Sequence, residues 1–147
     1  MSAYDVRVAG FDELDLVTAY RLWQLRSQVF VVEQECAYLD LDGRDREPAT
    51  RHVWAEASSA PGVPVACLRV LDDGDVARVG RVAVAEAHRR HGLAALLMHR
   101  AHELTDGRPV VLDAQAYLAR WYAGLGYVQT GPEFLDDGIP HVPMRRG

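Results

Sequence analysis

The chain has little of what would tie it to a membrane or to an oxidising compartment. Its 147 residues include two cysteines, Cys36 and Cys67, whose spacing matches no zinc or redox motif and which are too few for a disulfide framework. No apolar run approaches the roughly 20 residues that span a bilayer, and the N-terminus lacks the pattern of a signal peptide. We therefore expect two free thiols, no membrane partner and a cytoplasmic protein.

Positive charge is also scarce. The 16 Lys and Arg residues are outnumbered by 21 Asp and Glu residues, so the formal charge is -5, and Lys and Arg nowhere cluster beyond a pair. A broad surface that tracks phosphates is excluded on this ground, and we expect no nucleic-acid partner. The length fits one domain over residues 1–147. A domain of this size buries about two-thirds of its surface and so forms a core of its own.

Hydrophobic periodicity predicts a mixture of strands and helices. We expect Asp12 to cap the first helix and 110–114 to be an interior strand buried on both faces. The strand, helix and strand within 79–114 should pair in parallel, as in an α/β or α+β protein. The predicted strands are 4–9, 52–57, 65–71, 79–84, 110–114, 127–130 and 141–145; the helices are 13–30, one from 93 that Gly107 ends, and 118–125; an acidic loop or broken second helix covers 33–47.

The clearest chemical signal is the junction between the strand ending at Val84 and the helix beginning near Leu93. A helix start leaves backbone N–H groups unpaired and carries the positive end of the helix dipole. A glycine lets the chain curl so that these donors converge on an anion. Here Gly92 follows two arginines and a histidine. The loop is neither a P-loop nor a dinucleotide fingerprint. We interpret it as a phosphate site; the alternative is a solvated helix start.

This loop resembles the acetyl-CoA pyrophosphate loop of the GNAT superfamily of N-acetyltransferases, whose pattern Q/R-x-x-G-x-G/A is met by Arg89, Gly92 and Ala94. The segment WYAGLGY at 121–127 is similar to the family's aromatic-Tyr-x-x-x-Gly-aromatic segment. Further segments resemble the ElaA-like subfamily, and together they cover nearly the whole chain. They are residues 25–45, RH at 51–52, GRVAV at 80–84 and DDGIPHVPM at 136–144.

The resemblance implies a GNAT fold, a mixed twisted β-sheet flanked by helices, with acetyl-CoA in the cleft where the strands at Val82 and Val110 diverge. It implies direct acetyl transfer to a primary amine of a small molecule or a peptide. A non-catalytic acyl-CoA-binding sensor and an interaction module using the acidic loop stay open as alternatives, as does a homodimer. The residues expected at the cofactor are Val82, Ala83, Val84, Arg89, Arg90, His91, Gly92, Leu93, Ala94 and Ala95.

Acetylation of an amine needs two proton transfers. A lysine-type ammonium, with a pKa of about 10.4, must lose a proton before it attacks, and the departing thiolate must gain one. Tyr122 resembles the family's proton donor; its alternative is a half-buried aromatic side chain. Glu33 is a candidate base unless it is solvated or salt-bridged. His52 and His141 are further candidates at the acceptor, because histidines change charge near neutral pH.

The acidic loop predicts either an acceptor surface or a merely solvated segment. Asp40 and Asp42 are the carboxylates expected to attract a cationic amine. The sequence DLDGRD has its glycine fourth rather than sixth, unlike a calcium loop, and we expect no metal. Arg69 and Arg81 lie within apolar strands, and we expect them to pair with carboxylates of this loop. His99 and His102 are expected on an exposed helix face.

Overall fold

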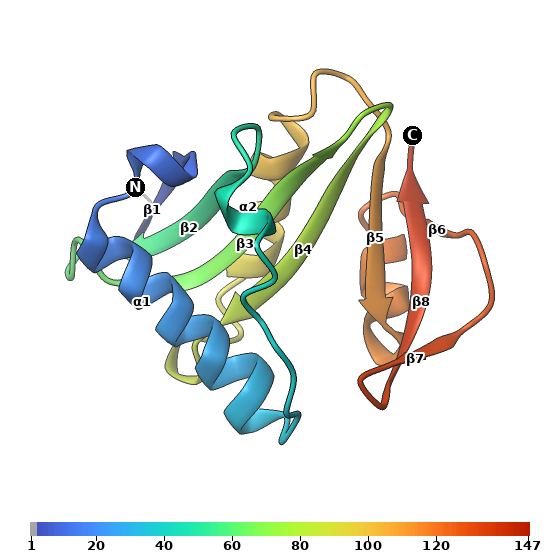
Figure 1. Cartoon of the computed structure of the whole chain (residues 1–147), viewed down its shortest axis with the longest axis horizontal. Helices are drawn as coiled ribbons and strands as arrows, with labels where there is room; N and C mark the ends of the chain where they lie inside the picture. Colours follow the sequence, from blue (N-terminus) through green and yellow to red (C-terminus); the bar gives the residue numbers. More distant parts are fainter. Residues whose placement is uncertain (1–2) are drawn as a thin grey trace.

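The computed structural model of the protein describes residues 3–147. These residues form one eight-stranded sheet in the order β1-β2-β3-β4-β5-β8-β6, with β7 paired to β8 (Figure 1). The pair β4 and β5 is parallel, as predicted, and the other pairs are antiparallel. The strands are β1 Tyr4–Ala9, β2 Arg51–Ala57, β3 Pro64–Asp73, β4 Val76–Val84, β5 Val110–Gln115, β6 Val128–Gln129, β7 Phe134–Asp136 and β8 Ile139–Arg146.

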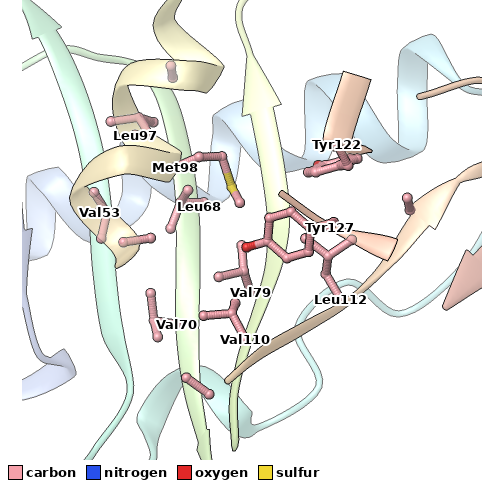
Figure 2. Packing of buried hydrophobic residues seen from close by; sticks show 14 of the residues in the cluster. Val53, Leu68, Val70, Val79, Leu97, Met98, Val110, Leu112, Tyr122 and Tyr127 are labelled. Carbon is pink, nitrogen blue, oxygen red and sulfur yellow. The ribbon is translucent and has the colours of Figure 1, made fainter. Parts of the chain in front are cut away.

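Helices cover both faces of the sheet, with α1 (Leu16–Arg26) in front of β2–β4 in Figure 1 and α2 (Leu93–His102) behind them. Successive residues of a strand point to opposite faces, so β2 and β3 contribute to two cores. Val53 and Leu68 pack with Leu97 of α2 (Figure 2), while Trp54 and Cys67 pack with the α1 side. Strand β2 is therefore buried on both faces. Both cysteines are free, as expected.

The first helix begins three residues later than predicted. Asp15, not Asp12, is its cap, because the Asp15 carboxylate accepts a 2.7 Å hydrogen bond from the Thr18 N–H. The Glu13 carboxylate accepts a 2.8 Å bond from the Gly10 N–H, which holds Phe11–Glu13 in a separate 3-10 turn. At its other end α1 passes directly into a π-helical segment, Ser27–Glu33.

Two further predictions are corrected in the C-terminal strands of the sheet. Strand β5 is not buried on both faces: Leu112 and Ala114 are buried, but Asp113 is exposed, because β5 leaves its neighbour β4 and borders a cavity. The C-terminal segment forms a hairpin of β7 and β8 rather than a loop and one strand. The acidic segment is a loop with one 3-10 turn, Arg44–Arg46, and the short helix α3 spans Ala119–Ala123.

Candidate active site

A cleft opens where β4 and β5 part. The two strands pair only at Ala77 with Val110 and at Arg78 with Val111, and in Figure 1 their ribbons then separate toward the ends of both strands. The cavity between them has a volume of about 640 Å³ and is lined by β4 from Val79 to Val84. Because β5 has left, the backbone N–H and C=O groups along this edge of β4 are not used by a neighbouring strand.

A β-bulge in β4 produces this divergence. Cys67 pairs with Ala83 and Arg69 pairs with Gly80, so two residues of β4 lie opposite Leu68 alone. Arg81, one of the two, has a φ of 55°, in the left-handed region. A bulge bends its strand and increases the local twist. The bend turns the second half of β4 away from β5 and opens the cleft.

The loop after β4 leads into an uncapped helix start. Gly92 is the N-cap of α2 with a φ of 72°, and no side chain caps the helix. A Cβ at Gly92 would meet no atom within 4 Å, so the space around it is open. The first N–H groups of a helix have no intrahelical acceptor, and α2 therefore presents free donors beside Arg90 and His91, which are both exposed.

Some of the predicted cofactor residues line the cavity, whereas others have side chains that are buried or partly buried elsewhere. Val82, Ala83, Val84, Arg89 and Ala94 line the cavity. Leu93 is buried in the core against α2's neighbours, so only its backbone is available there, and Ala95 is partly buried. The Arg89 guanidinium donates to the Val84 carbonyl at 3.1 Å and to the Glu33 carboxylate.

Tyr122 comes from α3 and lines the same cavity with 6% of its surface exposed. Its ring packs edge-on against Trp121 and Tyr127 at centroid distances of 4.9 and 5.9 Å. Within residues 3–147 its hydroxyl has no hydrogen-bond partner. Burial raises the pKa of Tyr122 to about 12, so the hydroxyl keeps its proton at neutral pH and can donate it.

Tyr127, whose ring packs against that of Tyr122, makes a contact with His102 that the sequence did not reveal. The hydroxyl of Tyr127, which is 1% exposed, lies 2.7 Å from Nε2 of His102 (Figure 2 shows the two tyrosines side by side). Burial lowers the pKa of His102 to about 4, so the imidazole is neutral in this contact. His102 thus differs from the exposed surface residue we expected.

The acidic loop is neutralised by arginines rather than open to a ligand. Asp40 and Asp45 are 6% and 4% exposed and bond to Arg26, at 2.9 and 2.8 Å. Asp42 bonds to Arg69 at 2.6 Å, and this hydrogen bond holds the pKa of Asp42 well below its usual range. The predicted pairing of the strand arginines with the loop is thereby confirmed. We call this group the Arg–Asp cluster; its members are Arg26, Asp40, Asp42, Asp45, Arg69 and Arg81.

This cluster changes the expectation for the acceptor residues. Asp40 and Asp42 do not line the cavity, because their carboxylates face the arginines. His52 is 2% exposed with Nε2 at 3.0 Å from the Asp45 carbonyl oxygen, and burial lowers its pKa. His52 is therefore held inside the cluster, away from the cavity. His141 does line the cavity, with Phe134 stacked on its ring at 5.9 Å.

Two carboxylates at the mouth were missed by sequence reasoning. Asp136 and Asp137 lie in the turn between β7 and β8, line the cavity, and have no cationic partner among the described residues. The Cys36 thiol donates to the Asp137 carbonyl at 3.5 Å, which ties the hairpin to the loop opposite. The DDG sequence marks this tight turn, with φ values of 49° at Asp137 and 78° at Gly138.

Residues 3–147 contain neither a metal-binding cluster nor a membrane-spanning helix. No group of three or more His, Cys, Asp or Glu side chains there is placed to hold a metal ion. None of the helices in this range is long and apolar enough to cross a membrane.

Comparison with known proteins gives consistent results along the chain. Residues 27–146 match the family described as an acetyltransferase (GNAT) domain. A UPF0039 protein of Mycobacterium tuberculosis is 45% identical over 139 residues, covering 91% of this chain and 87% of that protein. The crystal structure of an acyl-CoA N-acyltransferase from Pseudomonas aeruginosa has a TM-score of 0.91 at 38% identity, covering 98% of this chain and 99% of that one.

The ElaA-like resemblance is confirmed as well. The crystal structure of Escherichia coli ElaA superposes with a TM-score of 0.89 at 35% identity, over 98% of this chain and 99% of that one. The mixed sheet flanked by helices is thus the GNAT fold. The family match over most of the sequence and the shared fold show that this chain belongs to the GNAT family of acetyltransferases.

Proposed function

We propose that the protein transfers an acetyl group from acetyl-CoA directly to the primary amine of a small molecule or a peptide. The observation that carries this proposal is the joining of three features in one cavity: the unpaired edge of β4, the uncapped start of α2, and the Tyr122 hydroxyl. Each feature matches one part of the reaction, namely holding the acyl chain, holding a diphosphate, and donating a proton.

The residues present fit the cosubstrate chemically. Free N–H groups at Leu93–Ala95, with the positive end of the α2 dipole, are suited to a diphosphate. Arg90 adds positive charge beside Arg89, which is ion-paired with Glu33. Open space at Gly92 leaves room for the phosphates to approach the backbone. The unpaired strand edge at Val82–Val84 offers donors and acceptors to an amide-containing arm, and its N–H groups would polarise the acetyl oxygen.

Tyr122 would act as the general acid. Its hydroxyl, without a partner in the described chain and with a raised pKa, is protonated when the reaction begins. It would give this proton to the thiolate as the carbon–sulfur bond breaks. Glu33 and His141 are the carboxylate and the imidazole of this cavity that we predicted as candidate bases.

The mouth of the cavity favours an acceptor that arrives as an ammonium ion. Asp136 and Asp137 carry unpaired negative charge there, whereas the lining arginines Arg69, Arg78 and Arg81 are held in ion pairs. A cation is attracted to such a mouth. The proposed acceptor is therefore a basic amine, such as a polyamine or the side chain of a lysine-containing peptide.

Calorimetry with acetyl-CoA, followed by a free-thiol release assay over a panel of amines, tests this function. The panel contains polyamines, lysine peptides, aminoglycosides and free amino acids. We expect saturable binding of acetyl-CoA and amine-dependent thiol release above the rate without amine. Binding of acetyl-CoA without thiol release in the presence of any amine would favour an acyl-CoA-binding sensor. Absence of binding at millimolar acetyl-CoA would refute both the acetyltransferase and the sensor.

A further inference from the structure

We propose that His141 is the general base that takes the proton from the acceptor ammonium ion. This inference rests on the proposed acetyl transfer and names the residue that completes it. It is carried by three observations: the place of His141 in the cavity shared with Tyr122, the orientation of its ring, and the different engagement of the other candidate bases.

The ring nitrogens of His141 have distinct roles. Nδ1 lies 2.7 Å from the carbonyl oxygen of Ile139, and a carbonyl oxygen only accepts hydrogen bonds. Nδ1 therefore carries the hydrogen, and in the neutral ring the lone pair belongs to Nε2. The stacked ring of Phe134 holds the imidazole in this orientation. Neutral His141 thus has a basic nitrogen that no hydrogen bond within residues 3–147 occupies.

The other candidate bases are already engaged. The Glu33 carboxylate, at the end of the π-helical segment, accepts a hydrogen bond from the guanidinium of Arg89 in the loop before α2. Proton uptake by Glu33 would therefore break an ion pair. His52 lies inside the Arg–Asp cluster, with its Nε2 at the Asp45 carbonyl oxygen. Neither has the free lone pair that His141 has.

The charges around His141 favour the transfer. The cavity-lining carboxylates other than Glu33 are Asp113 on β5 and the hairpin pair Asp136 and Asp137. The neutral titratable groups are Cys36, Tyr38, Tyr117 and Tyr122. Asp113 is 3.7 Å from Arg78, whereas the hairpin pair is uncompensated. The hairpin pair therefore attracts the ammonium ion into the cavity that His141 lines.

The proton and electron balance is complete with the groups named. His141 Nε2 takes one proton from the ammonium ion, and the freed amine forms its bond to the acetyl carbon. The carbon–sulfur bond then breaks, and the sulfur takes the proton of the Tyr122 hydroxyl. The nitrogen of the new amide returns one proton to the Tyr122 oxygen. His141 releases its proton to water at the mouth, so the net products are the amide, CoA and one proton.

The ring orientation can be tested without any acceptor. Long-range proton–nitrogen correlation spectra of the full chain distinguish the two neutral histidine tautomers, and the His141→Asn spectrum assigns the signal. We expect the tautomer with hydrogen on Nδ1 and the lone pair on Nε2. The opposite tautomer, with hydrogen on Nε2, would overturn the proposal, because the lone pair would then be on Nδ1, which faces the Ile139 carbonyl oxygen.

Kinetics with the best amine of the panel test the role itself. Asn places an amide N–H near the position of Nδ1, so His141→Asn keeps a donor for the Ile139 carbonyl while removing the base. We expect a loss in kcat of about 100-fold or more, an unchanged dissociation constant for acetyl-CoA, loss of the acidic limb of the pH–rate profile, and partial rescue by added imidazole. The matched control is His99→Asn, since His99 is exposed on α2 and does not line the cavity; it should keep the wild-type rate.

A second variant separates the candidates. Glu33→Gln should keep the acidic limb of the profile if His141 is the base. Loss of that limb in Glu33→Gln with retention in His141→Asn would overturn the proposal and assign the base to Glu33. In either case the wild-type chain still turns over. A wild-type chain that binds acetyl-CoA but acetylates no amine would instead refute the proposed function itself, and the role of His141 with it.

Discussion

The Arg–Asp cluster predicts that Asp45→Asn will strongly destabilise the protein. Asp45 is 4% exposed, and its carboxylate accepts hydrogen bonds from Arg26 at 2.8 and 3.2 Å and from Arg69 at 3.1 Å. Three arginines and three aspartates make the cluster neutral. The variant would leave one buried positive charge uncompensated, which costs about 3–5 kcal/mol.

Urea unfolding measures this cost. With a slope of about 2 kcal/mol per M, the midpoint should fall by about 2 M. Asp12→Asn is the matched control, since Asp12 is exposed and forms no ion pair with the described residues, and its midpoint should stay within about 0.3 M of the wild type. A loss below about 1 kcal/mol in Asp45→Asn would refute the claim that the cluster is held by charge compensation.

The same variant has a pH signature. Burial alone would raise the pKa of Asp45, but the hydrogen bonds and charges of Arg26 and Arg69 hold it below its ordinary value. A carboxyl group with a depressed pKa in the folded state stabilises the protein above its unfolded pKa of about 4, and this contribution is lost as the pH falls. The stability difference between wild type and Asp45→Asn should therefore be largest near neutral pH and narrow below about pH 4.

Three further predictions concern the cofactor site and the first helix. Tyr122→Phe should lower kcat by about 100-fold while the dissociation constant for acetyl-CoA stays unchanged; lost affinity would make Tyr122 a structural residue. Gly92→Ala and Gly107→Ala should each destabilise by about 1 kcal/mol, since both glycines have left-handed φ angles, 72° and 74°, and open surroundings. Only Gly92→Ala should weaken acetyl-CoA binding in calorimetry, and equal affinities would contradict a phosphate site there. Asp15→Ala should cost about 1 kcal/mol in urea unfolding and Asp12→Ala close to none; the reverse order would restore Asp12 as the cap.

The parts of the site that were predictable are those written in consecutive residues. The strand end at Val84, the glycine at 92 and the helix that follows form one local unit, so their order in the sequence already fixes their proximity. Strand pairing of β4 with β5 followed from the helix between them. Tyr122 could be singled out through its resemblance to a family segment, but its burial and free hydroxyl required the fold.

The parts that were not predictable depend on loops meeting across the molecule. Glu33 and Arg89 are separated by 56 residues, and Asp42 and Arg69 by 27. Charges alone could not distinguish an acidic loop that attracts a ligand from one folded back onto arginines. For the same reason the sequence predicts Asp40 and Asp42 as the carboxylates that attract an amine, whereas the cavity-lining carboxylates without a cationic partner among the described residues belong to the β7–β8 hairpin.

The start of the first helix was mispredicted because two capping residues lie close together in the sequence. Asp12 and Asp15 lie three residues apart and are both good capping residues. The choice between them depends on the Glu13 carboxylate reaching back to the Gly10 N–H. This interaction holds the residues around Asp12 in a short 3-10 turn. The helix therefore starts after that turn.

The bulge at Arg81 links the acidic loop to the shape of the cleft. Its backbone adopts a left-handed φ of 55° in mid-strand, and its guanidinium lies 2.8 Å from an Asp40 oxygen and donates to the Asp40 carbonyl at 3.0 Å. Through these contacts between Arg81 and Asp40, the acidic loop is attached to the bent strand β4. A substitution that frees residues 40–45 from Arg81 should therefore also relax the bend of β4 beside the cleft.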